Sequence, residues 1–203
     1  IITGLVGSEM CIRDRNYTAP ARNRPLEADE QARFNAHHDE WREEVRHTFA
    51  AITGTPPPTR YPREDTPEER RALLDSKWEE GGMPQTLLAT YKGVNVDEDA
   101  NRAVADFVRD KIREIVKDQD VAETLCPPID LPIGAKRPPI DTDYYETFNR
   151  DNVTLVDVKK SPIQRVCRDG LDTADAHYPL DALVFATGFD AMTGAITRVD
   201  IVG

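Results

Sequence analysis

The stretch Gly134–Val153 reads GAKRPPIDTDYYETFNRDNV and separates two parts of the chain that differ in composition. Lys136 and Arg137 lie near its start, in a chain of formal net charge −11. Prolines at 127, 128, 132, 138 and 139 fix φ and lack N–H groups, so the segment that they punctuate from Cys126 onward is neither a regular helix nor a central strand. Lysine supplies a point charge for a phosphate, and the planar fork of arginine can hold a developing anion. Taken alone, the pair also fits an ordinary solvated surface.

The residues before this linker have a helical pattern. From about residue 27, a polar segment carries apolar residues three to seven positions apart, which favours one helical face. These apolar residues are Phe34, Trp41, Val45, Phe49 and Ile52. Thr66-Pro67-Glu68-Glu69 then offers an N-cap, a proline at the first helical position and a capping-box glutamate, and this helix should end at Gly81-Gly82. We expect Trp41 and Trp78 to pack in the core.

A third helix is predicted from about Asp97 to Asp118. Its apolar residues form one stripe and its charged residues the opposite face, as in a helix packed on a neighbour. The stripe consists of Val104, Phe107, Val108, Ile112, Ile115 and Val116.

Beyond the linker the pattern changes from helices to strands. Val153–Val158 and Ile163–Cys167 read as strands, and Asp169-Gly170 is a turn signal that makes the second of them part of a β-hairpin. Ala182–Ala186 is a continuous apolar run, as expected of a strand buried on both faces. Thr187-Gly188 follows, and small residues at such a strand end let a cofactor approach the backbone. Taken alone, this glycine also fits a simple turn.

The composition excludes several functions. An acidic chain with a pI of about 4.9 lacks the clustered basic surface that nucleic-acid binding needs. No apolar run is long enough to cross a bilayer, so we expect no membrane partner. The cysteines show no CxxC spacing and no even-numbered framework, which favours the cytoplasm; they are Cys11, Cys126 and Cys167. The histidines lack ligand spacing with any cysteine or carboxylate cluster, so we expect no metal; they are His37, His38, His47 and His177. The sequence carries no signal of an oligomeric state.

These patterns divide the chain into four segments. Residues 1–15 include Gly7–Arg15, which resembles the translation of a sequencing adapter, so we expect this segment to be non-native and outside the fold. Residues 16–130 form the helical region, 131–152 the linker that carries Lys136 and Arg137, and 153–203 the β-rich region. Because the chain starts without Met and stops just after a strand-like stretch, we expect an internal fragment of an α/β protein.

Two strings resemble type I Baeyer–Villiger monooxygenases, the group that includes cyclohexanone and phenylacetone monooxygenases. Gly134–Val153 is similar to the linker of that family, and Phe185–Gly194 to its alanine-threonine-glycine motif, where the chain returns from the NADP domain to the FAD domain. Upstream, Asn16–Pro20 looks like the strand exit after the NADP-binding motif, and 27–130 looks like the helical insertion of the NADP domain. The resemblance covers about residues 16–203. It implies part of a flavoprotein with two dinucleotide-binding domains.

The sequence also departs from the family pattern. No G-x-G-x-x-G occurs, so neither dinucleotide fingerprint is present, and the family signature F-x-G-x-x-x-H-x-x-x-W is missing. In the family both elements lie N-terminal to the matching region. We therefore expect this chain to be inactive in isolation.

The resemblance implies an oxidoreductase that uses FAD, NADPH and O2 to place an oxygen atom next to a ketone carbonyl, giving an ester or lactone. By matching position, Arg137 corresponds to the family's active-site arginine, where a fixed cation stabilises negative charge on oxygen. Lys136 corresponds to the lysine that contacts the 2′-phosphate of NADP. Ala186, Thr187 and Gly188 should line the cofactor cleft through their backbone.

Two alternatives remain open at this stage. The first is a related flavin monooxygenase that oxidises nitrogen or sulfur, although such an enzyme is not expected to keep the Lys136-Arg137 string in this form. The second is a nucleotide-binding or interaction module, an inactive remnant without oxygenation chemistry.

Overall fold

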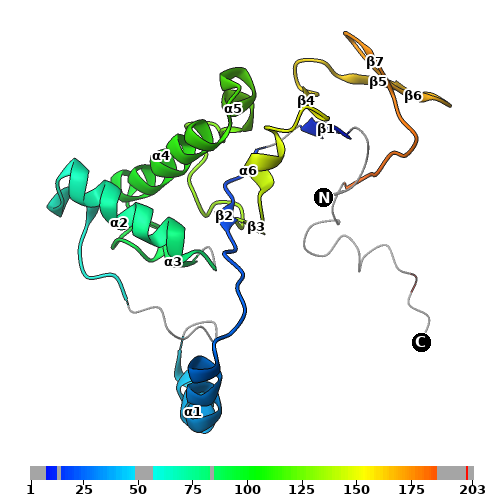
Figure 1. Ribbon diagram of the computed structural model, residues 1–203. Coiled ribbons are helices and arrows are strands. Elements are labelled where there is room, and N and C mark those ends of the chain that lie inside the picture. Colours follow the sequence, from blue (N-terminus) through cyan, green and yellow to red (C-terminus); the bar gives the residue numbers. More distant parts are fainter. Residues whose placement is uncertain (1–7, 13–14, 49–56, 83–84, 187–199, 201–203) are drawn as a thin grey trace. The chain divides into compact units, whose positions relative to one another are not determined.

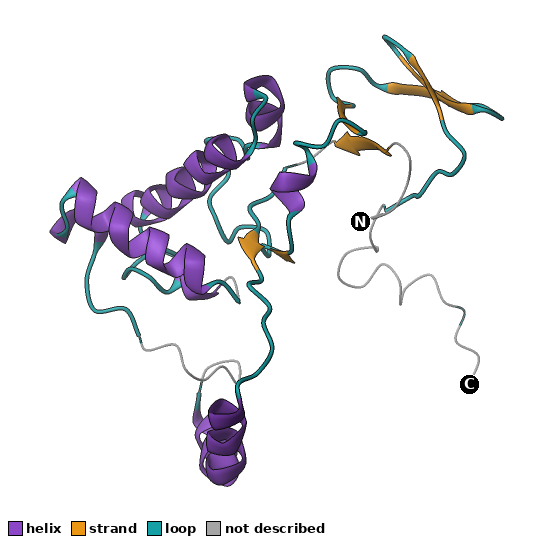
Figure 2. Cartoon of the chain, in the orientation of Figure 1, coloured by secondary structure: helices purple, strands orange, loops and turns teal. Residues whose placement is uncertain are grey.

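The computed structural model describes residues 8–12, 15–48, 57–82, 85–186 and 200 (Figure 1). The chain forms two compact units, residues 1–157 and 158–203. Helices and strands are both present, which confirms the expected α/β class (Figure 2). No helix within the described ranges is long and apolar enough to span a membrane.

The first unit contains all the helices of the described residues. They are α1 (Ala28–His47), the short 3-10 helix η2 (Pro62–Glu64), α2 (Pro67–Glu80), α3 (Gln85–Leu88), α4 (Glu98–Ile115), α5 (Gln119–Leu125) and α6 (Tyr144–Thr147). The capping box predicted for α2 is confirmed, because Thr66 Oγ1 accepts from the Glu69 N–H at 3.2 Å and Glu69 Oε2 accepts from the Thr66 N–H at 2.9 Å. At the start of α4, the Asp97 side chain accepts from the Ala100 N–H.

Helix α4 forms the centre of the hydrophobic core. Val104, Val108 and Ile112 are fully buried, so the apolar stripe predicted from the sequence is the packed face of this helix. The rings of Trp78 on α2 and Phe107 on α4 meet edge to face with 6.1 Å between their centroids. Burying such large side chains stabilises the unit more than any single surface contact, since the gain scales with the apolar area removed from water.

Helix α1 exists where it was predicted, but it contributes nothing to the core. None of its residues is buried, and the Phe34 side chain is 51% exposed. Phe34 and Trp41 instead pack on each other, with ring centroids 4.6 Å apart. The expectation that Trp41 lies in the core is therefore wrong, whereas it is confirmed for Trp78. The physical reason is that the few large apolar residues of this polar helix make too narrow a stripe to pack along a neighbour.

Two short parallel strand pairs complete the first unit. β1 (Ser8–Ile12) pairs with β4 (Val153–Asp157), and β2 (Ala19–Pro20) pairs with β3 (Ile140–Asp141). The strand predicted at Val153–Val158 is thus confirmed. β1 lies inside the segment 1–15 that the sequence analysis placed outside the fold, and its backbone nevertheless takes part in a parallel ladder.

The second unit contains an antiparallel three-stranded meander of β5 (Ile163–Val166), β6 (Gly170–Thr173) and β7 (His177–Pro179). The predicted hairpin is confirmed, and a second turn follows it because Thr173 Oγ1 accepts from the N–H groups of Asp175 and Ala176, both at 3.3 Å. Gly170 is required where β6 meets β7, since a Cβ there would lie 2.1 Å from the Tyr178 carbonyl oxygen.

The expected buried strand at Ala182–Ala186 is wrong. These residues have no regular secondary structure and are exposed; Val184 is 65% and Phe185 71% accessible. A strand buried on both faces needs hydrogen-bonded neighbours and covering layers. None of the described strands pairs with this run, and its side chains are exposed among the residues that the structure describes.

Candidate cofactor-contact site on the linker

A buried arginine anchors the backbone that leads into the linker. Arg109 of α4 is 5% exposed, and its guanidinium donates to the Pro127 and Pro128 carbonyl oxygens at 3.0 and 2.8 Å. It also donates to the Tyr17 hydroxyl, which in turn donates to the Leu131 carbonyl oxygen at 2.7 Å. Burial raises the pKa of Tyr17, so this hydroxyl keeps its proton for that bond. Arg109 thereby ties the start of the linker to the segment before β2.

Asn101 of α4 holds the next part of the linker. Its Oδ1 accepts from the Ile133 N–H at 3.0 Å, and its Nδ2 donates to the Ile133 carbonyl oxygen at 2.8 Å. The Ile133 side chain is itself buried in the core. A turn follows, closed by the Ala135 N–H donating to the Pro132 carbonyl oxygen, and Gly134 within it has a φ of +90°. That φ lies in a region that favours glycine.

The far side of the linker is fixed by the β2–β3 pair and by aromatic packing. The Ala19 N–H donates to the Pro139 carbonyl oxygen at 3.0 Å, and the Ala21 N–H donates to the Asp141 carbonyl oxygen at 2.7 Å. Tyr145 is 2% exposed and belongs to the core, where burial raises the pKa of its hydroxyl. Tyr145 thereby packs the linker onto this unit.

Lys136 and Arg137 stand between these two anchored ends. The Arg137 carbonyl oxygen accepts from Asn16 Nδ2 at 3.0 Å, which fixes the backbone there. Both side chains are exposed, and neither makes a hydrogen bond or ion pair with any residue that the structure describes. The site is thus a pair of free cationic side chains on a held backbone.

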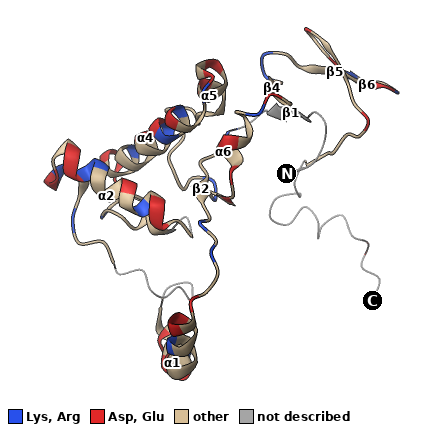
Figure 3. Cartoon of the chain, in the orientation of Figure 1, with Lys and Arg blue, Asp and Glu red and all other residues tan. Residues whose placement is uncertain are grey.

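Two basic residues on the helices of this unit, Arg71 and Lys111, behave differently. Figure 3 shows acidic and basic residues intermixed along α2 and α4. Arg71 on α2 pairs with Glu114 on α4 at 2.7 Å, and Lys111 on α4 pairs with Asp75 on α2 at 2.6 Å. These pairs join two helices, whereas Lys136 and Arg137 pair with none of the residues that the structure describes.

Of the three residues predicted to contact the cofactor near the end of the chain, the structure describes one. Ala186 is described, exposed, and part of the second unit, whereas Lys136 and Arg137 belong to the first. Thr187 and Gly188 lie outside the described residues.

Sequence reasoning missed the residues that hold the linker: Asn16, Asn101 and Arg109. Arg109 could have been found as a charged residue directly beside Val108 on the apolar stripe of α4. Asn101 and Asn16 carry no such signal, because their partners are backbone groups 32 and 121 residues away in the chain.

One histidine lies close to a carboxylate and a cysteine. His177 on β7 has its Nδ1 2.6 Å from Asp172 Oδ1, and the Cys167 thiol donates to Asp172 Oδ2 at 3.1 Å. Bonds from His177, Arg165 and Cys167, in that order, hold the pKa of Asp172 well below its ordinary value. His177 therefore lies within ligand reach of a cysteine and a carboxylate, which its spacing in the sequence did not indicate, because antiparallel pairing joins residues that are five apart in sequence.

Comparison with known proteins extends the likeness over nearly the whole chain. No family model matches. A crystal structure of OTEMO in complex with FAD and NADP superposes with a TM-score of 0.87 at 39% identity, over 96% of this chain and 36% of that chain. A Baeyer–Villiger monooxygenase from Pseudooceanicola batsensis is 36% identical over 193 residues, which is 94% of this chain and 34% of the relative. Phenazine N-monooxygenase from Lysobacter antibioticus is 42% identical over 137 residues, 67% of this chain and 25% of the relative.

The fold and the linker therefore place the chain among the FAD-binding monooxygenases. Within them it belongs to the Baeyer–Villiger monooxygenases, as the resemblance of the linker predicted. The chain spans about a third of the length of the relatives it matches.

Proposed function

We propose that this chain is the NADP-side segment of a flavin-dependent monooxygenase, which inserts one oxygen atom from O2 next to a ketone carbonyl to give an ester or lactone. The observation that carries the proposal is the Lys136–Arg137 pair, two free cationic side chains on an anchored linker. A small-molecule ketone and O2 are the proposed substrates. FAD and NADP(H) are the proposed cofactors, as in the OTEMO complex.

The residues present fit an anionic dinucleotide. The chain has 37 acidic residues against 26 basic ones, so unpaired carboxylates are plentiful, yet none of the described ones lies against Lys136 or Arg137. Cations kept free in an acidic protein raise the local potential for an anion. Because the bonds from Asn101 and Asn16 already order the backbone, less entropy is lost when a ligand binds.

Each cation has a proposed task. FAD and NADPH supply oxygen activation and hydride when bound. Lys136 would bind the 2′-phosphate that distinguishes NADP from NAD, as a compact point charge. Arg137 would hold the negative charge that develops on oxygen during attack on the ketone, through its planar fork. Ala186, Thr187 and Gly188 would contact cofactor through their backbone.

The experiment is a chimaera in which this chain replaces the matching third of OTEMO. With Arg137→Ala, NADPH oxidation should remain measurable while ester or lactone formation collapses. With Lys136→Ala, the apparent affinity for NADPH should fall by more than that for NADH. Arg150→Ala, an exposed arginine further along the same segment, is the matched control and should change neither.

Two results would refute these roles. Normal product yield in Arg137→Ala would remove the arginine from the chemistry. Equal losses with both nicotinamide cofactors in Lys136→Ala would remove phosphate recognition.

The alternative activity, oxidation of nitrogen, is favoured by the phenazine N-monooxygenase relative. The Baeyer–Villiger proposal is the stronger one because more of the chain matches the Baeyer–Villiger relative. Incubating the same chimaera with a cyclic ketone and with an N-heteroaromatic compound separates the two activities. An inactive binding remnant would give neither product.

The proposed compartment is the cytoplasm. Cys126 and Cys167 are both free thiols, and structural cysteines of oxidising compartments are usually paired.

A further inference from the structure

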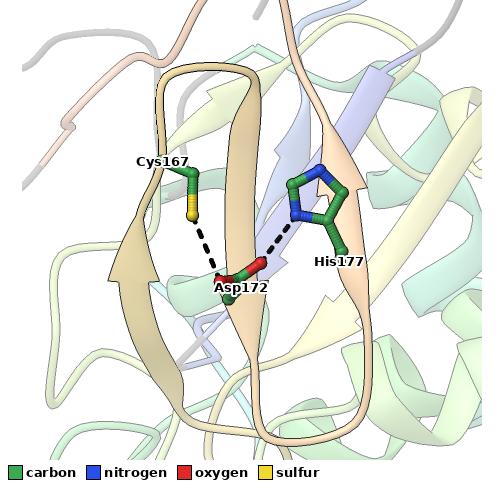
Figure 4. Close-up of side chains that lie close together, drawn as sticks. All are labelled: Cys167, Asp172 and His177. Atoms are coloured by element: carbon green, nitrogen blue, oxygen red, sulfur yellow. Dashed lines mark hydrogen bonds and ion pairs between the residues drawn. The ribbon is translucent and has the colours of Figure 1, made fainter.

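The meander of the second unit brings three metal-ligand side chains to one face. Asp172 on β6 is the cross-strand partner of Arg165 on β5 and of His177 on β7. Cross-strand partners project from the same face of a sheet, and Cys167 follows Arg165 by two residues. Figure 4 shows the Cys167 thiol and the His177 ring both pointing toward the Asp172 carboxylate. One ligand atom from each of the three lies within 4.8 Å of the other two.

We propose that Cys167, Asp172 and His177 form a binding site for a zinc-class divalent cation, independent of the flavin chemistry. A thiolate, an imidazole and a carboxylate are ligands that Zn²⁺ takes in proteins, whereas Mg²⁺ and Ca²⁺ prefer oxygen alone. With a metal ion bound, the three side chains would supply three positions of a tetrahedron. Water would supply the fourth, because the cluster lines an open cleft on the surface of the meander.

The geometry requires only small side-chain movements. Zinc–ligand bonds of about 2.0–2.3 Å place neighbouring ligand atoms of a tetrahedron roughly 3.3–3.7 Å apart. The separation of 2.6 Å between His177 Nδ1 and Asp172 Oδ1 must therefore open slightly, and that of 3.1 Å between Cys167 Sγ and the other oxygen, Oδ2, is already near this range. The side chains of Asp172 and His177 are 23% and 42% exposed, so solvent rather than packed core surrounds the movement. Binding replaces the thiol proton, which passes to solvent, and changes no oxidation state.

Arg165 opposes a cation at this place. Its Nη2 lies 2.7 Å from Asp172 Oδ2, so the guanidinium already occupies one carboxylate oxygen. A metal ion must displace it or share the carboxylate with it, and the two positive charges repel. Removing this one charge should therefore strengthen metal binding while every ligand stays in place.

Cobalt(II) titration of the 203-residue chain, prepared without a histidine tag, tests the proposal. We expect one equivalent of Co²⁺ to give a thiolate-to-cobalt charge-transfer band and the visible bands of a tetrahedral site, both removed by Zn²⁺. Cys167→Ser should abolish the charge-transfer band. His177→Ala should weaken the apparent affinity by at least about tenfold, since loss of a ligand costs no less than loss of its supporting contact.

Two further variants keep the test independent of folding. Cys126→Ala, which removes a buried thiol of the first unit, should leave the band intact. Arg165→Gln should tighten Co²⁺ binding by about fivefold or more, a gain that misfolding cannot produce. The proposal is overturned if no charge-transfer band forms, if the band survives Cys167→Ser, or if Arg165→Gln binds Co²⁺ no more tightly than the parent chain.

Discussion

Asn101 of α4 satisfies both backbone polar groups of Ile133, accepting from its N–H at 3.0 Å and donating to its carbonyl oxygen at 2.8 Å. The same Nδ2 also donates to the Val94 carbonyl oxygen at 2.7 Å. One side chain therefore joins the loop before α4 to the linker, three residues ahead of Lys136. Substitutions at this and other contacts should change the free energy of unfolding or a carboxyl pKa, and each effect can be measured on the chain itself.

Replacing Asn101 should destabilise the first unit. Asn101→Ala leaves the Ile133 N–H and two carbonyl oxygens without this partner, and we expect a loss of about 1–3 kcal/mol in the free energy of unfolding. Urea unfolding measures the loss, and amide hydrogen exchange should quicken at Ile133. Asn95→Ala is the control, because the Asn95 side chain is exposed and makes no hydrogen bond to a described residue. An equal effect of both variants would contradict the assigned role.

Replacing Arg109 should lower the free energy of unfolding by more than replacing Asn101. Arg109→Met removes a charged donor from the Pro127 and Pro128 carbonyl oxygens and from the Tyr17 hydroxyl, all near the core. We expect a loss of about 3 kcal/mol or more in the free energy of unfolding. In Arg102→Met the same change affects an exposed residue paired with Glu98, and the loss should be about 0.5 kcal/mol or less. Guanidinium chloride unfolding followed by tryptophan fluorescence compares the two.

The two linker cations should be neutral for folding. Lys136 and Arg137 are exposed and make no pairs with described residues, so Lys136→Ala and Arg137→Ala should each change the free energy of unfolding by less than about 0.5 kcal/mol. Thermal unfolding of the chain provides the measurement. A large loss of stability in either variant would show a structural role, and would weaken the interpretation of its catalytic defect.

The start of α1 should depend on pH. The hydrogen bond from Arg24, and then that from the Glu27 N–H, lowers the pKa of Glu30 to about 2 from an ordinary value of 4.5. Because the pKa in the folded chain is depressed, this stabilisation is fully present above about pH 4.5 and is lost as the pH falls through 2. Arg24→Gln should raise the pKa of Glu30 in a carboxyl-carbon NMR titration. An unchanged titration would leave the pair without effect, as is common for exposed ion pairs.

Local sequence signals identified the three long helices α1, α2 and α4, and the hairpin. The capping box at Thr66 and the stripe from Val104 to Val116 each depend on residues within a few turns of one helix, so the sequence contains their whole cause. The same holds for the turn at Gly170. The linker and its cations were found through their family likeness, and the solved structures confirmed the family.

Two local hydrophobic patterns led to wrong predictions of burial. The run Ala182–Ala186 has the composition of a buried strand, but burial is supplied by other segments, and none of the described strands pairs with it. Phe34 and Trp41 have helical spacing, yet no described segment buries their face of α1. A hydrophobic pattern indicates which face of a segment can be buried, but it does not show whether another segment packs against that face.

The sequence by itself thus determined the α/β class, the cations Lys136 and Arg137 and the family likeness from which their proposed roles follow. Only the tertiary structure decided how the linker is held, through Asn101, Arg109 and Asn16, and which side chains surround Asp172. The reason is physical: buried backbone groups must find hydrogen-bond partners, and those partners come from wherever the chain passes in space. Residue type determines whether a side chain can donate or accept a hydrogen bond or bind a ligand, and the packing of the chain determines which group becomes its partner.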